Sequence, residues 1–177
     1  MTLFQFVCFE TPFARPDFLS RWAPFASSFL ARGIERIVLS EQMGAGRFAY
    51  VSRNAWDRDR FAEAFGGQLP ADAGGGPVRA IQGGAFLLTA GVGLDPLVER
   101  TDAPKVIAFL QGDSAIALWR SHASSLPHDA AWALYERDPA TRGGRFDAVF
   151  ELFATPTPTL TSLGARPMLE ILALPER

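Results

Sequence analysis

The stretch RFDAVFELFA, residues 145–154, decides the fold. Its side chains alternate between two faces as in a β-strand, and neither face is polar enough to be exposed to water. Successive side chains of a strand point to opposite faces. One face carries Phe146, Ala148, Phe150 and Leu152, and the other carries Asp147, Val149, Glu151 and Phe153. The stretches KVIAFL (105–110) and ILAL (171–174) are apolar on both sides. Strands of this kind need cover on both faces.

The whole chain divides into two runs of elements with the same order: strand, helix, strand, strand, helix, strand. In the first run we expect strands at 2–10, 34–41, 47–53 and 78–90, and helices at 15–33 and 56–67. In the second run we expect strands at 105–111, 130–137, 145–154 and 167–174, and helices at 114–126 and 157–165. The chain is therefore predicted to be α+β, with halves at 1–100 and 104–177 that form one compact unit.

Local signals place the ends of two helices. Asp57 is expected to be the N-cap of the helix at 56–67, because a carboxylate accepts hydrogen bonds from the first free backbone N–H groups. Trp56 before it is expected to pack on Phe61 as a hydrophobic staple. Asp113 is expected to cap the helix at 114–126. Residues 66–77 are expected to form a loop, and the glycine-rich stretch 71–77 within it a linker, with a lid over the gap between helix and sheet as the alternative.

The first helix, 15–33, carries an aromatic side. Four residues recur at spacings of four, three and four, which places them on one helical face: Phe18, Trp22, Phe25 and Phe29. Pro24 is expected to kink this helix or to shorten it from the front.

Two landmarks indicate an internal duplication. Trp22 corresponds to Trp119, about 97 residues later, and Arg47-Phe48 corresponds to Arg145-Phe146, about 98 residues later. The landmarks fall in different elements, yet their offsets agree within about one residue. Each half should place its two helices on one face of a four-stranded sheet. The other face of each sheet is then left bare, and the nearest cover for it is the sheet of the other half. We therefore expect a closed pseudo-dimer.

Tandem βαββαβ halves that pair sheet to sheet resemble the ferredoxin-like dimeric α/β-barrel superfamily, which includes antibiotic-biosynthesis-type monooxygenases, EthD-like proteins, haem-degrading enzymes and stress-response barrel proteins. The segment Trp119-Arg-Ser-His122 is similar to the aromatic-then-histidine pattern on the first helix of EthD-like proteins. The first half departs from it, with Trp22-Ala-Pro-Phe25. The resemblance implies a pseudo-dimeric α/β barrel in which ligands bind in the gap between helix and sheet.

His122 is the candidate catalytic residue. On the helix at 114–126 it shares a face with Trp119 at helical spacing, and this face should lie toward the sheet. A neutral imidazole there could act as a base or bind haem iron. The alternative is a core histidine that hydrogen-bonds to a backbone carbonyl. His128 follows a proline in a turn and is expected to be solvated.

Four further residues are candidates for ligand binding. Trp119 and Trp132 offer flat apolar surface, and Tyr135 lies on the opposite face of the same strand from Trp132. Asn54 is placed at a strand end, where the resemblance implies that asparagine can help to hold a phenolic substrate. The competing interpretation makes the aromatic residues core or interface and Asn54 a turn residue.

The composition of the chain limits the classes of partner and cofactor that the protein is expected to bind. The net charge is −2, and the 17 basic residues are scattered, so no basic surface for nucleic acid is expected. The single cysteine, Cys8, excludes an intrachain disulfide and any metal site made of several cysteines, and we expect a buried, inert thiol. We predict no metal and no cofactor. No apolar run reaches the roughly 18 residues that span a bilayer, and no signal peptide is evident, so we expect a cytoplasmic protein, as a monomer or a homodimer.

Three functions remain open on the sequence. The first is a barrel that binds a small apolar or aromatic molecule between helices and sheet. The second is a cofactor-independent monooxygenase or isomerase for a phenolic or polyketide-like substrate, with His122 as the base. The third is a haem-binding protein. The sequence leaves open whether the protein is an enzyme, because function belongs to the site and not to the scaffold.

Overall fold

The computed structural model describes residues 1–74, 76–98 and 100–175, and predictions that fall on residues 75, 99 and 176–177 lie outside the described residues. Its elements, in chain order, are β1 (Thr2–Glu10), α1 (Arg15–Ala31), β2 (Ile34–Gln42), β3 (Tyr50–Asp57), α2 (Arg58–Phe65), β4 (Arg79–Val92), β5 (Pro104–Leu110), α3 (Asp113–Ser124), β6 (Ala131–Arg137), β7 (Ala148–Phe153), α4 (Pro158–Ser162) and β8 (Arg166–Leu174). The α+β class and the order of the elements agree with the prediction.

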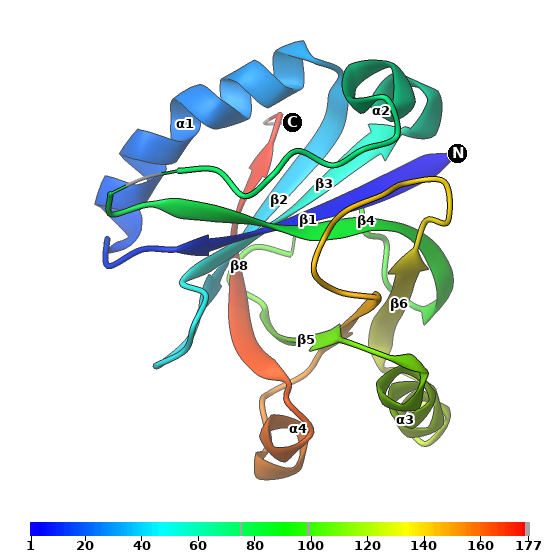
Figure 1. Ribbon diagram of the computed structural model, residues 1–177. Helices are drawn as coiled ribbons and strands as arrows, with labels where there is room; N and C mark the ends of the chain where they lie inside the picture. The colour runs from blue at the N-terminus through cyan, green and yellow to red at the C-terminus, as the bar shows by residue number, and fades with distance from the viewer. Residues whose placement is uncertain (75, 99, 176–177) are drawn as a thin grey trace.

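The eight strands close into one antiparallel barrel in the order β1-β3-β2-β8-β5-β7-β6-β4 (Figure 1). Strands β1–β4 are neighbours in the order β4-β1-β3-β2, and strands β5–β8 are neighbours in the order β8-β5-β7-β6. The pairs β2–β8 and β4–β6 join these two groups; Ile37 lies opposite Leu174, and Phe86 lies opposite Arg137. The predicted barrel architecture is therefore confirmed, and because the edges of the two groups pair, one continuous sheet surrounds the interior.

The strands have an inner and an outer apolar face. The inner face forms a core to which both halves contribute: Phe4, Phe6, Cys8, Phe48, Val51, Ala55, Ile81, Phe86, Ile107, Ala133, Tyr135, Val149 and Met168. Helices α1 and α2 cover the outer face of the first four strands, and α3 and α4 lie on the opposite side of the molecule over the second four (Figure 1). The expected alternation of residues 148–152 is confirmed, because Ala148, Phe150 and Leu152 pack outward while Val149 and Glu151 point inward.

Strands β3 and β7 each begin three residues after the expected arginine, at Tyr50 and Ala148. In the segments before them, Phe48 and Phe146 turn toward the barrel core, and their ring centroids are 6.4 Å apart. The two landmark phenylalanines thus meet at one end of the barrel. The alternation of residues within one segment cannot predict where these strands begin. The strand pairing ends at a contact between Phe48 and Phe146, which lie far apart in the chain.

The ends of α2 confirm the local signals. Asp57 is the N-cap, and its carboxylate accepts hydrogen bonds from the backbone N–H groups of Asp59 and Arg60. Trp56 packs edge-on against Phe61, with ring centroids 5.6 Å apart. The prediction for α3 was wrong, because Asp113 is the first helical residue and its N-cap is a glycine without a side-chain bond.

Replacing Asp57 with alanine is expected to lower the free energy of unfolding by about 1 kcal/mol, because two backbone donors lose their acceptor. Asp113→Ala is the matched control, since it removes an acidic residue from a first helical turn without removing a capping bond. Urea unfolding followed by circular dichroism measures both. An equal loss for the two variants would contradict the capping role.

Helix α1 runs without a break through Pro24, and its buried residues are Phe18, Trp22 and Ala26. Phe25 was expected on the buried face but is 64% exposed. On α3 the buried residues are Ile116, Trp119 and Ala123, and His122 lies half-buried at their margin. In the described ranges, no helix has both the length and the apolar character needed to cross a bilayer.

Candidate functional site

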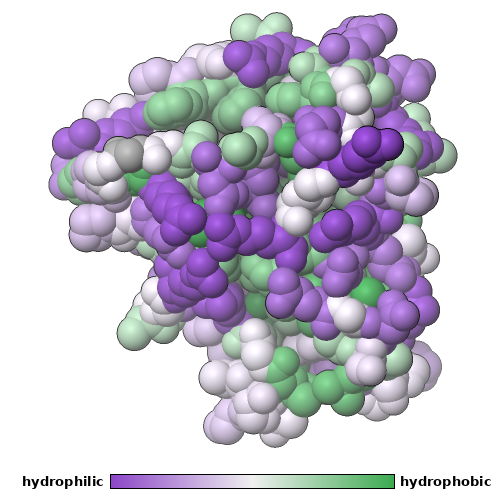
Figure 2. All heavy atoms as spheres, viewed as in Figure 1, coloured by the Kyte–Doolittle hydropathy of each residue, from purple (hydrophilic) through white to green (hydrophobic). Residues whose placement is uncertain are grey.

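A cleft of about 540 Å³ lies between α1 and the outer face of the barrel. It is lined by Phe18, Trp22, Phe25 and Phe29 of α1, by Asn54 and Gln82 of the barrel, and by part of the loop that follows α2. In Figure 1 this loop runs back alongside α1 before β4 begins, and Figure 2 shows apolar atoms between the two. We call this space the α1 cleft. Its loop wall includes residues 73, 74, 77 and 78.

The walls of the α1 cleft are apolar and partly rigid. The ring of Phe18 stacks on Tyr50 with centroids 3.8 Å apart and lies next to Trp22. Phe25 and Phe29 extend the aromatic side of α1 along the cleft. The open cleft explains the exposure of Phe25: its ring faces unfilled space, where the sequence pattern predicted packed sheet.

The floor of the cleft combines apolar side chains with two buried polar ones, Asn54 and Gln82, which both bond to the neighbouring Gln5. Gln5 lies opposite Asn54 across the β1–β3 pair and donates through Nε2 to Oε1 of Gln82, at 2.9 Å. Oε1 of Gln5 accepts hydrogen bonds from the indole N–H of Trp56, at 3.1 Å, and from Nδ2 of Asn54, at 3.4 Å. These side chains are almost completely buried, so the outer face of the barrel carries a hydrogen-bonded row under an aromatic helix.

Asn54 leaves one group of this row unpaired. It lies within β3, not at a strand end as expected, and is 2% exposed. Its Oδ1 has no hydrogen-bond partner within the described chain. A buried polar atom without a partner is costly and is rare in native proteins. Because Asn54 also lines the α1 cleft, its Oδ1 is the candidate acceptor for a hydrogen bond from a ligand.

Three of the predicted residues lie together in the other half, under α3. Trp119 packs on Phe150 with centroids 4.8 Å apart, and Phe150 in turn stacks on Trp132 at 5.5 Å. His122 approaches Trp119 edge-on at 5.5 Å, and its Nε2 is buried without a hydrogen-bond partner in the described part of the chain. His128 is exposed in a turn, as expected.

Tyr135 lies apart from this group. It points into the barrel, so the face of β6 that meets Trp119 is the one that carries Trp132. Asn54 belongs to the first half. The structure therefore brings together Trp119, His122 and Trp132, but it does not unite them with Tyr135 or Asn54. The α1 cleft lies under α1, whereas the sequence predicts a ligand site beneath the helix that carries His122.

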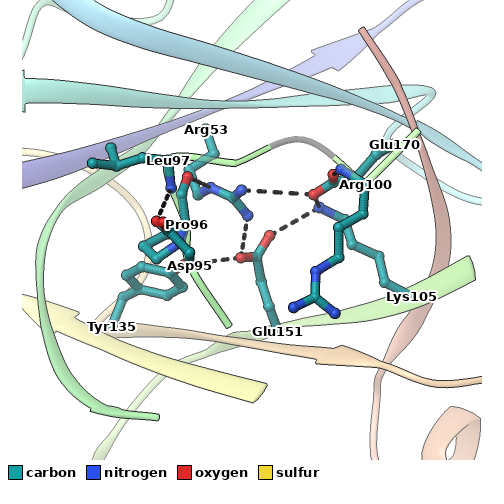
Figure 3. Close-up of polar contacts among 9 residues, drawn as sticks. All are labelled: Arg53, Asp95, Pro96, Leu97, Arg100, Lys105, Tyr135, Glu151 and Glu170. Atoms are coloured by element: carbon teal, nitrogen blue, oxygen red, sulfur yellow. Dashed lines mark hydrogen bonds and ion pairs between the residues drawn. The ribbon is translucent and has the colours of Figure 1, made fainter. Parts of the chain in front are cut away.

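A group of buried charges, missed by the sequence analysis, fills the middle of the barrel (Figure 3). We call Arg53, Lys105, Glu151 and Glu170 the interior charge cluster. Lys105 donates to Oε1 of Glu151 at 3.0 Å and to Oε1 of Glu170 at 2.9 Å. Arg53 pairs with the other oxygen of Glu151, to which the hydroxyl of Tyr135 also donates, at 2.9 Å. Two positive and two negative groups, each at most 2% exposed, thus balance one another.

The interior charge cluster keeps Glu151 ionised. Burial by itself would raise the pKa of this carboxyl, but Arg53, Lys105 and the donated hydrogen bonds more than offset it and lower the pKa to about 2. Burial, and next the adjacent Glu151, raise the pKa of Tyr135, so its hydroxyl remains a neutral donor. Near neutral pH neither group changes its protonation state. The interior charge cluster is therefore better suited to a structural role than to acid–base chemistry.

The interior charge cluster also binds the segment that connects the two halves. Nε of Arg53 donates to the carbonyl of Pro96 at 3.1 Å, and Glu170 accepts from the backbone N–H of Arg100 at 2.6 Å. Leu94 and Leu97 of the same segment pack on the inner core. The connection is therefore anchored to the barrel by both charges and apolar contacts (Figure 3).

A sequence signal for the cluster did exist. Each member is a single charge inside an apolar strand, as in VSRNAW (51–56), PKVIAF (104–109), VFELF (149–153) and MLEIL (168–172). Lys105 is moreover the only lysine of the chain. Charges are almost never fully buried unless they are paired, so four such strands predict mutual pairing. Glu151 lies inside the barrel with its partners, which the alternation of its strand alone does not reveal.

Among the described residues, no three histidine, cysteine, aspartate or glutamate side chains gather as metal ligands would. Cys8 is buried, as expected, and burial raises the pKa of its thiol. The reactive form of cysteine is the thiolate, which this burial disfavours.

Comparisons of the chain with protein-family models, with curated proteins and with solved structures find no match.

Proposed function

We propose that this protein binds a small apolar or aromatic molecule in the α1 cleft. The observation that carries the proposal is the combination of about 540 Å³ of open, aromatic-walled space with a buried, unpaired Oδ1 of Asn54 at its floor. Ligand sites in proteins are commonly concave, largely apolar and supplied with a few polar groups that fix orientation, with volumes of about 300–1,000 Å³.

Rigid walls favour binding as well. Phe18 stacks on both Trp22 and Tyr50, and the floor residues Asn54 and Gln82 are both hydrogen-bonded to Gln5. A site whose side chains are already ordered loses less conformational entropy when a ligand enters. Both the sheet floor and the helix wall of the cleft are therefore suited to a ligand that binds without rearrangement of these side chains.

We further propose that the fold arose by duplication of a ferredoxin-like unit, as in a dimeric α/β barrel fused into one chain. Two observations support this: the strand orders β4-β1-β3-β2 and β8-β5-β7-β6 correspond, and the landmarks Trp22 and Trp119 both lie on the buried face of the first helix of their half. The cleft then belongs to the helix–sheet gap of the first half, where the histidine position of the second half is taken by Phe25.

The test uses the fluorescent dye 1-anilinonaphthalene-8-sulfonate, whose emission rises in apolar surroundings. We expect saturable binding to the folded protein and energy transfer from tryptophan that falls in Trp22→Phe. Ala80 lines the cleft from β4, so Ala80→Phe should fill it and weaken dye binding roughly tenfold or more, through steric exclusion.

The control is Ala62→Phe, which adds the same ring on the exposed side of α2 and should leave binding unchanged. Circular dichroism of each variant verifies that it is folded. Equal dye affinity in Ala80→Phe and Ala62→Phe would show that the dye binds elsewhere and would overturn the proposal.

A further inference from the structure

We infer that the ligand of the α1 cleft is an amphipathic organic anion: an apolar body with a hydrogen-bond donor at its inner end and an anionic group at its outer end. This inference rests on the proposed function and specifies its ligand class. Three features carry it: the unpaired acceptor on Asn54, the aromatic walls and the position of Arg21.

The inner end requires a donor because of Trp56. An indole N–H can only donate, so the atom of Gln5 that faces Trp56 must be the carbonyl oxygen. The group of Asn54 that faces the same oxygen must then be its NH₂, which leaves Oδ1 as the free atom. The indole of Trp56, which can only donate, thus fixes which atoms of the floor are donors and which are acceptors. A ligand hydroxyl or N–H complements the free acceptor on Asn54.

The outer end favours an anion because of Arg21. This residue lines the cleft from α1 and is exposed. Its guanidinium lies 4.3 Å from the ring centroid of Phe13, and no ion pair with a carboxylate is found for it among the described residues. Arginine is well suited to bind carboxylate or sulfonate groups.

The two ends lie on opposite sides of the cleft, which sets the shape of the ligand. Asn54 belongs to the barrel and is 2% exposed, whereas Arg21 belongs to the helix and is in contact with solvent. The ligand inferred from this arrangement is a rigid apolar molecule with substituents at its two ends and its body against Phe18 and Trp22, which also line the cleft.

Three probes separate these contributions: 6-hydroxy-2-naphthoate has donor and anion, 6-methoxy-2-naphthoate lacks the donor, and 2-naphthol lacks the anion. Titration calorimetry should give the tightest binding for 6-hydroxy-2-naphthoate. The methoxy compound should bind roughly tenfold more weakly, because it leaves Oδ1 of Asn54 unpaired. The affinity of 2-naphthol should be lower by about twofold to fivefold, because an ion pair at an exposed rim contributes little.

Two variants assign the effects to residues. Asn54→Leu should abolish the preference for the hydroxy compound over the methoxy compound. Arg21→Gln should weaken both naphthoates about twofold to fivefold and leave 2-naphthol unchanged. Each variant thus changes one selectivity and preserves the other, which a general loss of folding would not do.

The outcomes distinguish the two proposals. If the naphthoates bind in the cleft, as judged by their loss in Ala80→Phe, but without these preferences, the ligand class is wrong and the proposed binding function stands. If neither the probes nor 1-anilinonaphthalene-8-sulfonate bind in a manner sensitive to Ala80→Phe, the proposed function itself fails.

Discussion

Replacement of Glu151 with glutamine is expected to lower the free energy of unfolding at neutral pH by about 3–5 kcal/mol, the loss typical of removing one partner from a buried ion pair. Glutamine has nearly the same shape and can still accept a hydrogen bond from Tyr135. It removes only the negative charge that Arg53 and Lys105 share. Two buried cations are then left with the single carboxylate of Glu170. Urea unfolding followed by tryptophan fluorescence measures the change.

Glu136→Gln is the matched control. Glu136 belongs to the neighbouring strand β6 and pairs with Arg120, whose side chain is 57% exposed. The same substitution there should cost less than about 1 kcal/mol, because water screens an exposed pair. Equal losses in the two variants would mean that the interior charge cluster contributes no more than a surface pair.

The pH dependence of the same variant gives a second measurement. The pKa of Glu151 is about 2 in the folded protein and has its ordinary value of 4.5 when the chain is unfolded. A lowered folded pKa stabilises the protein fully above pH 4.5, and this contribution is lost as the pH falls toward 2. The difference between wild type and Glu151→Gln should therefore be largest near neutrality and shrink below pH 4.5. A difference that stays constant to pH 3 would contradict the role of the ionised carboxylate.

The sequence predicts the elements of this fold better than their assembly. Amphipathic spacing, the capping residue Asp57 and the staple between Trp56 and Phe61 act over a few residues, so local patterns reveal them. The pairs β2–β8 and β4–β6 that close the barrel join strands far apart in the chain. The later starts of β3 and β7 have the same origin, because Phe48 and Phe146 meet only after the barrel has closed.

Local sequence patterns do not predict the candidate site, for a related reason. Phe25 belongs to an apolar helical face, but it borders a cleft because of the path of the loop after α2. The sequence predicts a ligand-binding role for Asn54, but its free Oδ1 depends on Gln5, 49 residues away, and on Trp56. The single charges in apolar strands were visible in the sequence, and their pairing could have been predicted. Only the closed barrel, however, determines which charge meets which.

Replacement of Trp56 with alanine is expected to destabilise the protein by about 3–5 kcal/mol, the range for removing a large buried aromatic side chain. The side chain is fully buried, and its ring packs against Phe61 and Phe65 of α2. Its removal would leave a cavity beneath the helix and free a buried acceptor on Gln5. Trp132→Ala is the control, because Trp132 is only half-buried and should cost less. Urea unfolding followed by circular dichroism suits both variants, since each loses a fluorophore; equal losses would contradict the prediction.

Trp56→Phe separates the packing of the ring from the hydrogen bond. Phenylalanine retains most of the contacts with α2 but cannot donate to Gln5, so we expect a loss of about 1–2 kcal/mol. Without the indole donor, the side-chain amides of Gln82, Gln5 and Asn54 are free to exchange their donor and acceptor ends together. The cleft should then lose its preference for a ligand with a donor, while Phe18 and Trp22 still bind the apolar body. Trp56→Phe that keeps the full preference of the wild type for 6-hydroxy-2-naphthoate over 6-methoxy-2-naphthoate would show that some other group sets the polarity of the floor.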